Sequence, residues 1–168
     1  MLGLASTALS AGFCILGGWL SDRFGRRRTL AIFIAGTTLP TFGMALAMHR
    51  FGWIMPISPQ ALDRPIPPHE LVALFWGLTL AYAVFQGLMY GVGTAIYMDV
   101  TTPAVAATQF TGYMALCNLV YSYTATWQGH ALVRWGYPAT LTADGFFGLV
   151  SLSLLPFMGR LRSESPPR

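Results

Sequence analysis

A short charged segment near the N-terminus holds the residues with the clearest chemistry. It reads Gly18-x-x-x-Asp22-Arg23-x-Gly25-Arg26 and is followed by two further arginines. Glycines permit a tight turn between two helices. Asp22 can cap a helix or pair with an arginine, and the arginines can contact anionic lipid headgroups. The pattern indicates charge pairing at a membrane surface.

Three polar side chains lie on one face of the apolar stretch 71–97. Gln86, Tyr90 and Tyr97 are spaced i, i+4 and i+11, close to the period of a helix. Polar groups that face lipid are costly, so such a stripe marks either a pathway or a helix contact. Two interpretations stay open for each residue: contact with a substrate, or an interhelical hydrogen bond of about 0.6 kcal/mol.

A second, somewhat broader polar stripe runs along the stretch 108–133. Its members are Thr111, Asn118, Tyr121 and Ser122. Transporters built from repeats bind substrate near the midplane of the bilayer. We therefore predict that Asn118 and Tyr121 face the first stripe across a water-filled cavity, and that the two stripes bind a small molecule there.

Asp144 is the only carboxylate well inside an expected membrane span. As a proton carrier it would couple uptake to a proton gradient. Alternatively, it lies within about two turns of the outer interface and reaches water or Arg134. Both interpretations remain open at the level of sequence.

The remaining reactive side chains do not form a catalytic pattern. His49, His69 and His130 are widely separated, and two of them are in or beside a loop. Cys14 and Cys117 fall inside apolar stretches without the short spacing of a zinc site or a disulfide framework. We expect no enzyme activity, metal or cofactor. The net charge of +4 needs no nucleic acid to explain it.

The elements that must position these residues are transmembrane helices. Hydrophobic residues make up 54% of the chain and charged residues only 10%, whereas a soluble domain carries about 25% charged residues. A bilayer core needs about 20 apolar helical residues. The sequence predicts an all-α polytopic helix bundle in contact with the lipid bilayer, with five transmembrane helices near 1–20, 29–48, 71–97, 108–133 and 139–158.

Arginine distribution predicts the orientation of this bundle. All ten basic residues are arginine. With five crossings, seven arginines share the side of the C-terminus and three lie opposite, in or near the proline-rich loop 49–70 and the turn before the last helix. The positive-inside rule then puts the N-terminus outside and the C-terminus in the cytoplasm.

The charged segment also resembles the signature loop of the major facilitator superfamily, which joins the second and third helices of each six-helix half. The resemblance implies a partial major facilitator fold in which this loop holds the cytoplasmic gate closed. The gating residues would be Gly18, Asp22, Arg23, Gly25 and Arg26. Simple positive-inside topology is the alternative, and Arg27 and Arg28 could serve it alone.

A second resemblance covers about residues 97–156. The tetrapeptide Ala107-Thr108-Gln109-Phe110, an aromatic-rich turn and one last helix are similar to the AmpG-like group of muropeptide permeases and acetyl-coenzyme A transporters. Related siderophore permeases share this layout. The resemblance implies a permease of the inner (plasma) membrane whose substrate is a muropeptide, an acyl-coenzyme A or a siderophore.

Together the two resemblances identify the chain with helices eight to twelve of a twelve-helix transporter. Residues 1–158 would form the helical bundle and residues 159–168 a cytoplasmic tail. The partner implied is the missing N-terminal half, without which the chain should not transport. The expected function is proton-coupled transport of a small solute; the alternative is a non-transporting membrane scaffold or assembly subunit.

Overall fold

The computed structural model describes residues 1–58 and 60–157, and within these ranges its regular structure is helical, without β-strands. This confirms the all-helical prediction. The tail predicted for residues 159–168 lies outside the described residues. The elements are α1 (Leu2–Phe24), α2 (Arg26–Arg50), α3 (His69–Val100), the 3₁₀ helix η1 (Pro103–Val105), α4 (Ala106–Leu154) and the 3₁₀ helix η2 (Leu155–Phe157).

Among the described residues, four helical segments are long and apolar enough to cross a membrane by length and composition. They are α1, α2, α3 and the segment Pro103–Phe157. The sequence predicted five helices, whereas the structure has four long ones. The difference arises because the stretches predicted as separate helices at 108–133 and 139–158 are joined within α4.

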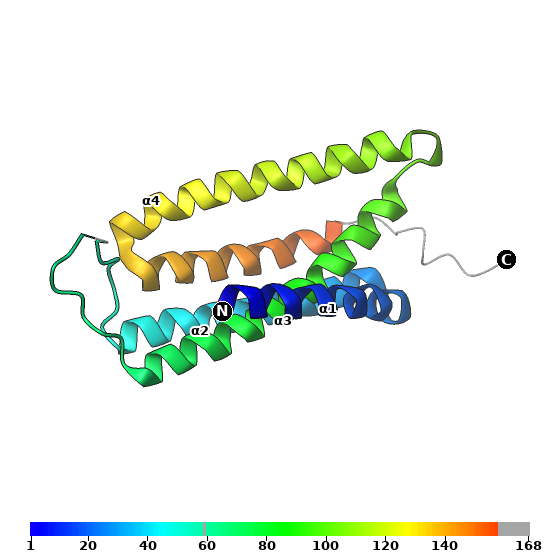
Figure 1. Ribbon diagram of the computed structural model, residues 1–168. Coiled ribbons are helices and arrows are strands. Elements are labelled where there is room, and N and C mark those ends of the chain that lie inside the picture. The colour runs from blue at the N-terminus through cyan, green and yellow to red at the C-terminus, as the bar shows by residue number, and fades with distance from the viewer. Residues whose placement is uncertain (59, 158–168) are drawn as a thin grey trace.

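α4 is bent sharply at one glycine. It has 49 residues, more than twice the number that one crossing needs. Gly136 has φ 78° and ψ 179°, outside the helical region and favourable only for glycine. The chain folds back there, so that a first arm (106–135) and a second arm (137–154) run antiparallel (Figure 1).

The segment after α2 fixes this bend. The backbone N–H of Tyr137 donates to the carbonyl oxygen of Ile54 at 2.7 Å. A Cβ atom at Gly136 would overlap that same carbonyl oxygen. Residues 51–58, residues 60–68 and the bend thus share one end of the bundle, the left end in Figure 1, which we call the loop end. Buried apolar residues stabilise it: Ala47, Met48 and Leu71, with Trp53, Tyr137 and Leu141 packed against them.

α1 and α3 approach each other backbone to backbone. A Cβ atom at Gly17 would collide with the carbonyl oxygen of Leu88. Cβ atoms at Gly87 and Gly91 would likewise collide with the carbonyl oxygens of Ser10 and Cys14. Small residues at such crossings let membrane helices gain van der Waals contact where the hydrophobic effect supplies no driving force. These three glycines therefore set the spacing of the pair.

α2 lies between this pair and the second arm of α4. Its Phe33 packs into a buried cluster with Leu88, Val92 and Ile96 of α3. On the other side, Gly145 and Gly148 of α4 allow close contact with the Phe42 ring and the Thr38 methyl group. At the end opposite the loop end, only Gly25 separates α1 from α2. We call this end, with its run of arginines, the arginine end.

Two glycines on neighbouring faces of α3 provide a matched test of the crossing. Gly91→Ala should destabilise the chain by about 1–3 kcal/mol, because the new methyl group has to displace the Cys14 backbone. Gly93→Ala meets no atom within 4 Å and should be neutral or stabilising by up to about 1 kcal/mol. Unfolding in mixed detergent micelles, followed by circular dichroism, measures both. Equal effects of the two substitutions would contradict the close crossing.

Candidate functional site

Arg26 connects three helices at the arginine end. It is the first residue of α2, and its Nη1 lies 3.2 Å from Oδ1 of Asp22 near the end of α1. Its Nη2 donates to Oδ1 of Asp99 at 3.1 Å, while Nε faces the second carboxylate oxygen of Asp99. Asp99 belongs to the last turn of α3. One guanidinium thus bridges α1 and α3 from α2, with a two-pronged contact on Asp99.

The two carboxylates differ greatly in exposure. The side chains of Arg26 and Asp99 are 12% and 17% exposed, whereas that of Asp22 is 66% exposed. Removing one member of a sheltered ion pair leaves an uncompensated charge, which is costly. An exposed pair contributes little. Asp99 is therefore the structural partner of Arg26, and Asp22 retains a carboxylate surface that is open to another molecule.

The joint between α1 and α2 is shorter than the sequence predicted. α1 continues to Phe24, so Gly18 lies inside the helix and not in the turn. Gly25 alone makes the turn, with a φ of 88°. Arg23 extends over the ring of Trp19, with its guanidinium carbon 5.8 Å from the ring centroid. Of the five residues assigned to the gate, Asp22 and Arg26 form an ion pair with each other.

The largest cavity by volume among those described measures about 900 Å³ and lies between α1, α3 and the first arm of α4. Thr111 and Ser122 of the second stripe do not line it, but the other members of the two polar stripes do: Gln86, Tyr90, Tyr97, Asn118 and Tyr121. Polar residues at helical spacing on two separate segments therefore face the same cavity. That these residues bind a substrate remains a prediction.

α1 supplies the third wall of this cavity, which the sequence interpretation missed. Ser6, Ser10 and Cys14 line it, spaced four residues apart. This i, i+4, i+8 pattern of small polar residues was the signal available in the sequence. The glycines of α3 bring that face close, because they pack directly on the backbone of Ser10 and Cys14.

The first arm of α4 contacts the rest of the bundle at two places, one toward each end. At the arginine end, the Tyr97 hydroxyl lies 3.1 Å from the Cys117 sulfur, and its ring stacks on Tyr113 with centroids 5.6 Å apart. At the loop end, Trp127 meets the Phe147 ring of the second arm edge to face, with centroids 5.4 Å apart. Asn118 and Tyr121 lie between these attachments, and they line the cavity together with Tyr97 and Cys117.

Asp144 lines a second cavity of about 450 Å³, between α2, α3 and both arms of α4. It accepts a hydrogen bond from Nε2 of Gln128 on the first arm. Arg134, offered from the sequence as its partner, forms no ion pair with it in the described structure. Asp144 thus lies in a cavity separate from the one lined by the polar stripes. Tyr82, one helical turn before Gln86 on α3, lines the Asp144 cavity too.

The described residues contain no group of three histidine, cysteine or acidic side chains placed to hold a metal ion. Comparison of the chain with protein-family models, curated proteins and solved structures finds no match. The function is therefore inferred from the two cavities and from the Arg26 ion pairs.

The unequal exposure of the two carboxylates gives a direct test of their roles. Asp99→Asn should destabilise the chain by about 3 kcal/mol, because the sheltered guanidinium of Arg26 loses its counter-charge. Asp22→Asn makes the same chemical change at an exposed position and should cost less than about 1 kcal/mol. Thermal unfolding in detergent compares the two. A larger effect at Asp22 would overturn the assignment of Asp99 as the structural partner.

Proposed function

We propose that the chain is five of the six helices in the C-terminal half of a proton-coupled secondary transporter of the major facilitator type. Its five crossings are α1, α2, α3 and the two arms of α4, which correspond to helices eight to twelve. The arginine end faces the cytoplasm and the loop end faces outside, in keeping with the positive-inside rule. The membrane is the cell inner (plasma) membrane.

The observation that carries this proposal is the cavity of about 900 Å³ with both polar stripes on its walls. Its volume is within the range of small-molecule sites, about 300–1,000 Å³. A scaffold subunit has no need of such a space. Tyrosine rings offer aromatic surface, and Gln86 and Asn118 offer amide donors and acceptors. Muropeptides, acyl-coenzyme A and siderophores are substrates of matching chemistry, since each is polar and bulky.

The Arg26 ion pairs support a gating role for the arginine end. Asp99 and Arg26 hold α2 and α3 together inside this half. Asp22 contacts Arg26 through its Oδ1 atom, and its side chain is largely exposed. It can therefore also form a charge contact with the opposite half of the transporter. In this proposal the contact closes the cytoplasmic side, and its rupture opens the cavity.

Asp144 and Gln128 provide the proton-coupling site of the proposal. An ionised Asp144 accepts the hydrogen bond that the Gln128 amide donates. A protonated Asp144 can instead donate its O–H to the amide oxygen once the amide has rotated. The pair can thus hold the carboxyl group in either protonation state within the membrane, as a carrier requires.

Equilibrium binding to the purified chain in lipid nanodiscs tests the proposal. The probes are a disaccharide tetrapeptide, acetyl-coenzyme A and a ferric siderophore. We expect one of them to bind, and Asn118→Ala to weaken that binding about fivefold, the equivalent of one hydrogen bond of about 1 kcal/mol. Thr126→Ala is the matched control, because the Thr126 hydroxyl bonds only to the backbone of Ser122.

Binding of no probe, or equal binding by the two variants, would contradict the site and favour the scaffold alternative. The circular dichroism of each variant confirms that it is folded.

A further inference from the structure

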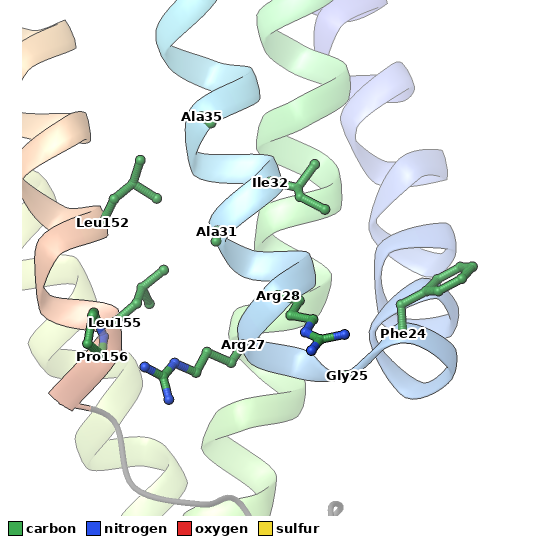
Figure 2. A pocket seen from close by; sticks show the side chains of 10 residues that line it. All are labelled: Phe24, Gly25, Arg27, Arg28, Ala31, Ile32, Ala35, Leu152, Leu155 and Pro156. Carbon is green, nitrogen blue, oxygen red and sulfur yellow. The ribbon is translucent and has the colours of Figure 1, made fainter.

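A third cavity, of about 830 Å³, lies at the arginine end outside the proposed substrate site. It runs along the first turns of α2 between the end of α1 and the end of α4. Most of its wall is apolar or small: Phe24, Ala31, Ile32, Ala35, Leu152, Leu155 and Pro156. Figure 2 shows Arg27 extending toward Pro156 and Arg28 extending toward the Phe24 side of α2.

The two arginines of this groove have no counter-charge among the described residues. The nearby carboxylates of Asp22 and Asp99 are both paired with Arg26. Arg27 and Arg28 form no ion pair within the described part of the chain. Two guanidinium groups thus lie at one end of an otherwise apolar groove, and they require an anion or water.

The shape of the groove also indicates what accompanies the anion. Ala31 and Ala35 are one turn apart and leave room over α2, with Leu152 and Leu155 opposite. From Arg28 to Ala35 the groove follows α2 for about 10 Å, at about 1.5 Å per residue. A free inorganic anion would leave this apolar length uncovered. A molecule with a phosphate at one end and a hydrocarbon chain at the other satisfies both parts.

We infer that this groove binds one anionic phospholipid, with its phosphate between Arg27 and Arg28 and an acyl chain along Ala31 and Ala35 against Leu152. The lipid then joins α2 to the last turn of α4 at the arginine end. Arginine suits this role because its planar guanidinium can donate two parallel hydrogen bonds to phosphate oxygens. The site does not depend on the transport proposal, because it shares no residue with the substrate cavity.

Native mass spectrometry of the purified chain measures this binding directly. The chain is incubated with equal amounts of a phosphatidylglycerol and a phosphatidylcholine of identical acyl chains. We expect one phosphatidylglycerol to be retained in preference to phosphatidylcholine. Arg27→Gln and Arg28→Gln should each weaken its retention about fivefold, which corresponds to about one arginine near an anionic surface.

Two further variants distinguish lipid binding in the groove from non-specific attraction of the anionic lipid to positive charge. Arg23→Gln removes one positive charge from the same joint outside the groove and should leave retention unchanged. Ala35→Leu keeps every charge but fills the groove and should weaken retention several-fold. Leu39→Phe, on an exposed face of α2, is its control.

Equal retention of the two lipids by the unsubstituted chain would overturn the inference, and this result needs no variant to fold. An equal loss in Arg23→Gln and Arg27→Gln, or full retention in Ala35→Leu, would overturn it too. Loss in the groove variants alone, at unchanged circular dichroism, supports it.

Discussion

The ion pair between Arg26 and Asp99 is the interaction on which the arrangement of this chain depends. A charged side chain in or near a bilayer must find a partner or reach water. Here the guanidinium of Arg26 forms ion pairs with both nearby carboxylates, of which Asp99 is sheltered and Asp22 is exposed. The pair fixes the ends of α1, α2 and α3 at one side of the membrane. Among the described residues it also leaves Arg27 and Arg28 without an acidic partner, and these two arginines line the groove that we propose binds an anionic lipid.

From this fixed end, α1 and α3 run side by side as one unit. Gly17, Gly87 and Gly91 bring their backbones into contact, so neither helix can tilt without breaking that packing. The first arm of α4 is different, since it is attached mainly near its ends, through Tyr97 at the arginine end and Trp127 at the loop end. The large cavity extends along this arm from the attachment at Tyr97 to Tyr121. A rigid pair facing a more loosely held helix is an arrangement suited to opening and closing around a solute.

The sequence predicted the helical class, the apolar stretches and the polar residues of α3 and α4 that line the large cavity, because helical period and hydropathy are local properties. It could not predict contacts made between distant segments. Nothing in the spacing of Arg26 and Asp99 along the chain indicates that they pair, because they belong to different helices. Asp144 bonds to Gln128, not to a nearby arginine, because the bend at Gly136 brings the two arms of α4 together. That bend joins two predicted helices, and so the helix count differed.

A substrate site of this kind requires that the space between α1, α3 and the first arm of α4 hold water inside the membrane. Spin labels at Asn118→Cys and Tyr123→Cys, with Cys14 and Cys117 replaced by serine, test it most directly in the reconstituted chain. Asn118 lines the cavity, whereas Tyr123 is 72% exposed on the same arm and outside it. We expect a polar nickel reagent to relax the label at residue 118 more than oxygen does, and oxygen to dominate at residue 123. Dominance of oxygen at both positions would contradict it.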